Sequence, residues 1–241
     1  MPLFDIEEVK KRVIRSVERG ATPVAAFDAD GTLWEIDMGE VFFEYQIENN
    51  LLPGLRKDAF AHYFSLFKTH SPQTAYLWLA QINKGVSPEQ MLNWSRECAK
   101  KTEVPFISFQ KELVDFFHEH QIEVFVVTAS IRYAVAGAAE MLGIDFDHVL
   151  GVDVEVRENL LTDEQRGPIT WKEGKMLALQ NRLNGRKPVF CSGNTMGDLH
   201  LLEFSSDVRL VIAKASIDHK NYATEHELMS LAQERDWFFC E

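Results

Sequence analysis

The sequence of 241 residues has few cysteines and little positive charge, and it lacks long apolar runs. Its three cysteines, Cys98, Cys191 and Cys240, are odd in number and far apart. Such spacing suits neither a disulfide framework nor a zinc site, and a reducing compartment is the natural setting for free thiols. We therefore predict a cytoplasmic protein.

No uninterrupted apolar run in the sequence reaches the length of a membrane span, and the segment 1–8 is acidic where a secretion signal would be basic. Lys and Arg number 25 against 37 Asp and Glu, which gives a formal net charge of −12. Such an excess of negative charge argues against nucleic acid or an anionic membrane as a partner. It is ordinary for an acidic enzyme.

Short apolar runs alternate with amphipathic segments along most of the chain. Strands are predicted at 23–27, 122–128, 189–191 and 208–213, a hairpin at 149–161, and helices at 5–19, 108–121, 131–142, 175–183, 198–204 and 223–234. This alternation is typical of an α/β protein with a doubly wound, parallel, Rossmann-like sheet.

The stretch from Met38 to Lys101 differs from the rest because it contains only helical patterns and many aromatic residues. Its breaks at Pro53-Gly54, Ser71-Pro72 and 85–88 supply the residues that end or start helices. We therefore expect a core domain of residues 1–36 and 104–241, with an inserted all-helical cap domain of residues 37–103.

Two carboxylates, Asp28 and Asp30, directly follow the first predicted strand, and Gly31 allows a sharp turn after them. In open α/β sheets, ligands bind just beyond the carboxyl ends of the strands. Asp and Gly are also common turn residues, so this stretch alone could simply end the strand.

Two more predicted strands end in polar groups that could join Asp28. One ends at Thr128, followed by Ala129, and the other runs into a Gly-rich loop that contains Asn194 and Asp198. Clustered carboxylates repel one another unless a cation lies among them. A ligand set made only of oxygen, with few carboxylates, indicates Mg²⁺.

A cation beside a carboxylate, a hydroxyl and a lysine forms a site suited to a phosphoryl group. One Asp can attack phosphorus and form an aspartyl phosphate. A second carboxylate can protonate the departing oxygen and then activate water. This chemistry needs both Asp28 and Asp30, whereas a non-catalytic binding protein on the same fold needs neither.

These motifs, in this order, resemble those of the haloacid dehalogenase-like (HAD) hydrolases, chiefly their phosphatases. The resemblance implies that Asp28 is the nucleophile and a magnesium ligand, and that Asp30 is the general acid and base, ligating through its main-chain carbonyl. It also implies that Thr128 and Lys175 hold the phosphate, with Ala129 beside them.

Two positions depart from or blur the family pattern. The fourth motif opens with Asn194 where Asp is usual, so either Asn194 or Asp198 could be the direct ligand, or Asp198 could act through water. Lys172 and Lys175 both stand near a predicted helix start. The pattern Lys-x-x-x-Leu favours Lys175.

The place of the insertion resembles the phosphoserine phosphatase branch of the family. That branch uses an acidic residue for the substrate amine, for which Asp37 has the matching spacing, and a cap arginine, for which Arg96 is the nearest candidate. Asp37 could equally cap the helix that begins near Met38.

Aromatic residues of the predicted cap leave a further alternative. Phe60, Tyr63, Phe64 and Phe67 recur at helical spacing, which favours one packed helix face over a cation–π cage for a choline-like group.

The sequence thus predicts a magnesium-dependent phosphatase of a small phosphomonoester, such as phosphoserine or another amino-alcohol phosphate. A phosphocholine-type phosphatase and a phosphotransferase remain alternatives within the enzyme class. A non-catalytic binding protein is the alternative outside it.

Overall fold

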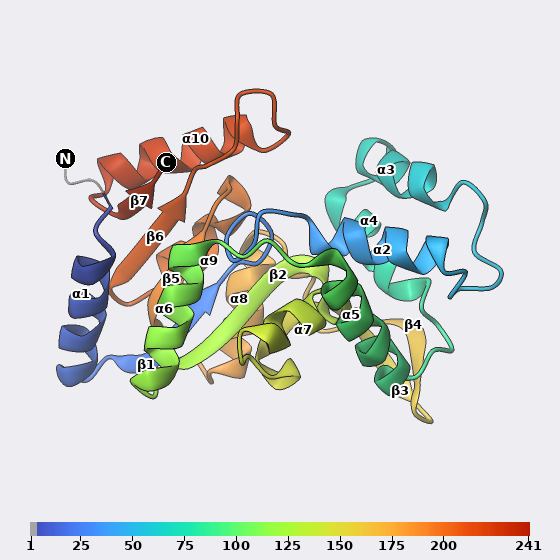
Figure 1. Cartoon of the computed structure of the whole chain (residues 1–241), viewed down its shortest axis with the longest axis horizontal. Helices are drawn as coiled ribbons and strands as arrows, with labels where there is room; N and C mark the ends of the chain where they lie inside the picture. Colours follow the sequence, from blue (N-terminus) through green and yellow to red (C-terminus); the bar gives the residue numbers. More distant parts are fainter. Residues whose placement is uncertain (1–3) are drawn as a thin grey trace.

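The computed structural model describes residues 4–241, so residues 1–3 of the predicted core domain lie outside the described part (Figure 1). Its centre is a seven-stranded sheet in the order β4-β3-β2-β1-β5-β6-β7. The strands are β1 (Thr22–Phe27), β2 (Glu123–Ile131), β3 (Val149–Arg157), β4 (Leu160–Arg166), β5 (Pro188–Gly193), β6 (Val208–Ile212) and β7 (Phe238–Cys240). All neighbours are parallel except β3 and β4, which confirms the predicted α/β class.

Strand β1 lies at the middle of the sheet, between β2 and β5. The chain first builds the sheet outward from β1 through β2 to β4 and then returns to the other side of β1 for β5 to β7. A reversal of this kind leaves a crevice at the carboxyl ends of the central strands. The three strands that carry the polar motifs are therefore adjacent.

Helices cover both faces of the sheet, as expected for a doubly wound fold (Figure 1). Ala25 and Phe27 of β1 pack into the core shared with α1 (Ile6–Glu18), α6 (Ser108–Glu119) and α7 (Arg132–Met141). The alternate residues, Val24 and Ala26, pack into the core shared with α8 (Glu173–Arg182), α9 (Leu199–Phe204) and α10 (Tyr222–Glu234). Alternation along β1 thus buries both of its faces.

Four helices fill the stretch 37–103 that was predicted as the insertion: α2 (Met38–Glu48), α3 (Ala59–Thr69), α4 (Pro72–Gln81) and α5 (Pro88–Thr102). Asp37, Ser71 and Ser87 cap three of them with side-chain oxygens. The chain leaves the core and returns side by side, since Ile107 N donates to Leu33 O at 2.9 Å. The boundaries of a separate cap domain stay a prediction. No helix within residues 4–241 is long and apolar enough to cross a membrane.

Two further contacts join the inserted helices to the core. Ser95 of α5 lies so close to Gly137 of α7 that a Cβ at position 137 would be 2.4 Å from Ser95 O. Gly137 N donates to Ser95 Oγ at 2.8 Å, which fixes the contact. After α4, Gly85 N donates to Leu161 O of β4 at 2.8 Å. The last third of the insertion is therefore anchored to the core at two places.

The predicted hairpin at 149–161 is confirmed as β3 and β4, which turn through Glu158 (φ +50°) and Asn159 (φ +61°). The predicted end of the second strand at Thr128 was wrong, because β2 continues to Ile131 through a register shift. Ala129 and Ser130 thus lie in an irregular strand end, and the helix predicted from 131 starts at Arg132. Strand β7 was not predicted.

Candidate active site

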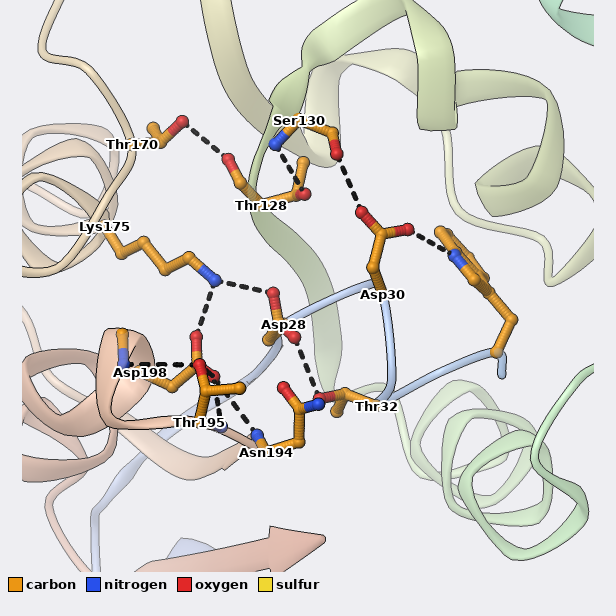
Figure 2. A network of polar contacts seen from close by, with 12 residues as sticks. Asp28, Asp30, Thr32, Thr128, Ser130, Thr170, Lys175, Asn194, Thr195 and Asp198 are labelled. Carbon is orange, nitrogen blue, oxygen red and sulfur yellow. Dashed lines mark hydrogen bonds and ion pairs between the residues drawn. The ribbon is translucent and has the colours of Figure 1, made fainter. Parts of the chain in front are cut away.

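Eight residues predicted from the sequence to form the site line a single cavity of about 370 Å³ at the carboxyl end of β1, whereas the candidates Arg96 and Lys172 do not. The set comprises Asp28, Asp30, Asp37, Thr128, Ala129, Lys175, Asn194 and Asp198. Most of them come from the ends of β1, β2 and β5, which the parallel sheet brings to one edge, while Lys175 belongs to α8 and Asp37 caps α2. Figure 2 shows the polar contacts among most of them.

Asp28 is the first residue after β1 and is 5% exposed. Its main-chain N–H donates to Ser192 O of β5 at 2.9 Å. The hydrogen bonding between β1 and β5 thus extends to the residue that carries the carboxylate. Thr32 Oγ1 donates to Oδ2 at 2.9 Å, and Lys175 Nζ donates to Oδ1 at 2.5 Å (Figure 2). The Asp28 carboxylate is thus held in one orientation with a cation beside it.

Lys175 of α8 lies between two buried carboxylates. Its Nζ is 2.5 Å from Asp28 Oδ1 and 2.5 Å from Asp198 Oδ1. Burial alone would lower the pKa of Lys175, but the two carboxylates raise it above its ordinary value, so the lysine stays charged. Lys172, the other sequence candidate, is exposed, and its Nζ lies 4.5 Å from the Trp171 ring. Of the two lysines, Lys175 lines the cavity.

Both oxygens of the Asp198 carboxylate are engaged within the protein. Oδ1 faces Lys175, while Oδ2 accepts hydrogen bonds from Asn194 N at 3.1 Å and Thr195 N at 3.0 Å. These bonds fold the loop after β5 around the carboxylate. Asp198 therefore shapes the loop and positions Lys175.

Asn194 is oriented by a residue that the sequence did not reveal. Its Nδ2 donates at 2.9 Å to Oε1 of Glu225, a residue of α10 that is 4% exposed. Its amide oxygen points toward Asp28 (Figure 2). Ala215 N donates to Glu225 Oε2 at 2.8 Å, which fixes that side chain in turn. Position 194 thus has an amide where the family pattern has a carboxylate, and that amide donates a hydrogen bond to the carboxylate of Glu225.

Gly31 touches the same amide. Its φ is +79°, and a Cβ at this position would lie 2.2 Å from Asn194 Nδ2. Position 31 therefore requires glycine both for its backbone conformation and for the space that Asn194 takes.

Asp30 accepts hydrogen bonds on both oxygens. Trp34 Nε1 and Met38 N donate to Oδ1 at 2.7 and 2.9 Å, and Ser130 Oγ donates to Oδ2 at 2.7 Å. Burial, reinforced by the nearby charge of Asp37, raises the pKa of Asp30 to about 7. Burial and the charge of Asp198 also raise the pKa of Asp28, against the opposing charge of Lys175.

The end of β2 supplies a hydroxyl and a turn of main chain. Thr128 Oγ1 accepts a hydrogen bond from Ser130 N at 3.0 Å, and Thr128 O accepts one from Thr170 Oγ1 at 2.6 Å. The residues Ser130 and Thr170 thus support the strand end, although no motif in the sequence marks Thr170.

The outer wall of the cavity is formed by the inserted helices and one core loop. Asp37 caps α2 by accepting from Glu40 N at 3.0 Å, as the helix-capping interpretation predicted. Its Oδ2 also lies 3.3 Å from Lys220 Nζ. Arg96 pairs with Glu140 at 2.6 Å and does not line this cavity.

Aromatic side chains complete the outer wall. Tyr63, Phe64 and Phe67 pack on one another, with ring centroids 5.1 Å apart for Tyr63 and Phe67, so the packed helix face is present. The same three rings also line the cavity, together with Tyr76 and Trp171. These aromatic residues can therefore pack as one helix face and at the same time present their rings to a ligand in the cavity.

The oxygen donors fit a magnesium ion better than a softer metal. Within residues 4–241, no group of three or more His, Cys, Asp or Glu side chains is arranged to hold a metal. The candidate donors are the Asp28 carboxylate, the Asn194 amide oxygen and the Asp30 carbonyl that the family resemblance implies, since Ala29 O already accepts from Thr32 N and Leu33 N. A set with few carboxylates suits Mg²⁺, which keeps several of its waters.

Solved structures share this fold at low sequence identity. A protein of unknown function from Bordetella pertussis Tohama I is 17% identical, with a TM-score of 0.73 over 92% of this chain and 99% of that chain. A functionally unknown protein from Anaerococcus prevotii DSM 20548 is 15% identical, with a TM-score of 0.68 over 91% and 85%. A phospho-aspartyl intermediate analogue of phosphoserine phosphatase is 14% identical, with a TM-score of 0.52 over 91% and 93%.

These likenesses confirm the predicted similarity to phosphoserine phosphatases at the level of the fold. No curated protein matches the sequence closely enough to count as a relative. The family model of haloacid dehalogenase-like hydrolases matches residues 25–203, which include Asp28, Lys175 and Asp198. The chain therefore belongs to the haloacid dehalogenase-like hydrolase family, as its motifs predicted.

Proposed function

We propose that the chain is a magnesium-dependent phosphatase that hydrolyses a small phosphomonoester through an aspartyl phosphate on Asp28. The observation that supports this most directly is the contact of the buried Asp28 carboxylate with Lys175 at 2.5 Å. A carboxylate held beside a fixed cation at a strand end is placed to meet a phosphoryl group.

In the first step, an oxygen of Asp28 forms a bond to phosphorus while the ester oxygen leaves. Thr32 holds the other oxygen of Asp28 at 2.9 Å, so the attacking oxygen needs little reorientation. Lys175, Thr128 and the main chain at Ala129 bind the phosphoryl oxygens.

Asp30 gives its proton to the departing alkoxide. In the second step, the Asp30 carboxylate takes a proton from water, whose oxygen bonds to phosphorus as the Asp28–phosphorus bond breaks. The products are the free alcohol, inorganic phosphate and the original Asp28 carboxylate. The hydrogen bonds from Trp34 and Ser130 hold Asp30 in place for both transfers.

Asp28, the Asp30 carbonyl and Asn194 would hold Mg²⁺, with Asp198 supporting them from the loop. A bound Mg²⁺ supplies positive charge that balances the phosphoryl oxygens and the carboxylates around them. The Glu225 hydrogen bond directs the Asn194 amide oxygen toward that position.

The outer half of the cavity, which is the part lined by Asp37, Glu40 and Lys220, favours an ester whose leaving group is cationic. Asp37 and Glu40 line it with two carboxylates, and their one ion-pair partner in the described part of the chain is Lys220. An amino alcohol, such as that of phosphoserine or phosphoethanolamine, supplies a compensating charge. Phosphocholine is a second candidate because Tyr63, Phe67 and Tyr76 line the same space, and aromatic faces bind alkylated ammonium groups.

A screen of phosphate esters tests the proposal. Phosphate release is measured for phosphoserine, phosphoethanolamine, phosphocholine and glycerol phosphate, with magnesium and with EDTA. We expect turnover only with magnesium, and faster turnover of the cationic esters. Full activity in EDTA, or no hydrolysis of any ester by folded protein, would contradict the proposed function.

A further inference from the structure

The loop between β6 and α10 brings a cation, Lys220, into the outer half of the candidate active site. Lys220 Nζ lies 2.7 Å from Glu40 Oε1 and 3.3 Å from Asp37 Oδ2. Both carboxylates belong to the start of α2. The ion pairs therefore join a core loop to the inserted helices across the cavity that Asp28 lines.

The charges at this contact do not balance. Two carboxylates face one lysine, and among residues 4–241 the only further donor to them is Glu40 N, which donates to Asp37. Burial and the charge of Asp37 raise the pKa of Glu40, which reflects this crowding. Burial would lower the pKa of Lys220, but the two carboxylates raise it on balance. The position between Asp37 and Glu40 thus prefers a positive charge.

Aromatic rings border the same position. Burial raises the pKa of both Tyr63 and Tyr76, in the case of Tyr76 to about 12, and the charge of Asp37 adds to both shifts. Tyr63, Tyr76 and Asp37 also line the same cavity. Carboxylates together with aromatic faces are the combination that recognises alkylated ammonium groups.

Lys220 also stands between two cavities. The second cavity, of about 370 Å³, shares Asp30, Asp37, Lys220 and Asn221 with the first. The Lys220 side chain is 56% exposed, so it has space on the second side if it leaves the carboxylates. The ion pair of Lys220 with Asp37 is thus part of the wall that the two cavities share.

We propose that Lys220 is a specificity-determining residue: its ammonium occupies the position of the substrate's cationic group, and an ester of an alkylated amino alcohol displaces it to bind. This inference rests on the proposed function, because it concerns the leaving-group half of the same site. An ester without a cation gains no binding free energy from displacing Lys220, so Lys220 stays beside Asp37 and Glu40.

Binding of choline, which carries no phosphate to hydrolyse, tests the displacement by calorimetry. The variants are Lys220→Met, which removes the resident cation, and Lys220→Arg, which keeps it. Lys214→Met is the matched control, since Lys214 borders only the second cavity and forms no ion pair with Asp37 or Glu40. Exposed ion pairs reduce the affinity of a competing ligand by about 2- to 5-fold.

We expect Lys220→Met to bind choline about fivefold more tightly than the wild type, and the Arg and Lys214 variants to bind it like the wild type. Choline should also increase labelling of Lys220 by an amine-reactive reagent, measured by mass spectrometry. Equal tightening in Lys214→Met would attribute the effect to general charge and overturn the inference. Weaker binding in Lys220→Met, or no choline binding by any variant, would overturn it as well.

Phosphate release separates this inference from the proposed function. If choline displaces Lys220 but the wild type hydrolyses no ester, only the proposed function fails. If the wild type hydrolyses esters but Lys220→Met changes KM equally for phosphocholine and glycerol phosphate, only the role of Lys220 fails.

Discussion

The two halves of the candidate active site hold their charges in opposite ways. In the inner half, Lys175 lies 2.5 Å from both Asp28 and Asp198, and all three residues are at most 5% exposed. In the outer half, Lys220 is 56% exposed and contacts its two carboxylates at 2.7 and 3.3 Å. Buried pairs are costly to break, whereas exposed pairs contribute little. The inner half is therefore fixed before substrate arrives, and the outer half can rearrange around it.

The inner half contains the reacting groups, so its loss should have the largest effect. Asp28→Asn keeps the shape of the side chain but removes the attacking carboxylate. We expect phosphate release to fall below detection, while circular dichroism and the unfolding transition show a folded protein. Release at the wild-type rate would rule out an aspartyl phosphate on Asp28.

Asp30→Asn should slow turnover by about 10²–10⁴-fold, the usual range for loss of general acid–base catalysis. Its effect should depend on the leaving group, because p-nitrophenol departs without a proton donor and a simple alcohol does not. Kinetics on p-nitrophenyl phosphate and phosphoserine measure this difference. Equal slowing of phosphoenzyme formation for both esters would argue against a proton-donor role.

The same substitution in each half compares their contributions to stability. Lys175→Met leaves buried carboxylates without their cation and should lower the free energy of unfolding by about 3–5 kcal/mol. Lys220→Met removes an exposed pair and should lower it by about 0.2–1 kcal/mol. Urea unfolding of both variants measures the two values. Similar losses would show that the two halves are not held differently.

The hydrogen bond between Asn194 and Glu225 orients the Asn194 amide at the inner half of the site. Asn194→Asp places a carboxylate where Nδ2 now donates to Glu225 at 2.9 Å, so a buried hydrogen bond becomes a repulsion. We expect a loss of about 1–3 kcal/mol in the unfolding free energy of the metal-free protein. Adding Glu225→Gln should restore most of it. A double variant as unstable as Asn194→Asp would exclude repulsion as the cause.

The smallest effect concerns Asp37, which both caps α2 and faces the cavity. Asp37→Ser keeps a capping oxygen and removes the charge, so stability should stay unchanged while KM for cationic esters rises about 2- to 5-fold. Asp37→Ala should cost a further ~1 kcal/mol because the cap is also lost. Equal changes of KM for phosphoserine and glycerol phosphate would remove the charge-recognition role.

Local patterns were sufficient to predict the inner half. Asp28, Thr128 and Asn194 each stand at the end of a short apolar run, and a parallel sheet brings the ends of adjacent strands together. The extension of β2 beyond Thr128 could not be predicted, because a register shift against β3 produces it. Strand β7 has three residues and depends on its pairing with β6.

The residues that contact the predicted site residues could not be predicted from the sequence. Glu225 is 31 positions from Asn194, and Lys220 is 183 positions from Asp37. Each belongs to the segment around α10, which carries none of the family's motifs. Only tertiary packing brings them to the cavity, so no spacing in the sequence marks them.

The close approach of α5 to α7 at Ser95 and Gly137 bears on how the insertion can move. Two helices whose backbones touch this closely cannot slide past each other without breaking the Gly137 N to Ser95 Oγ bond. Amide hydrogens of α5 should therefore exchange with solvent as slowly as those of the core. Helix α2 also packs on α7 and β2, whereas α3 packs chiefly on α4. Motion of the insertion is therefore left to α3, the helix that carries Tyr63, Phe64 and Phe67 of the outer wall. The entrance to the cavity can then fluctuate while its floor stays rigid.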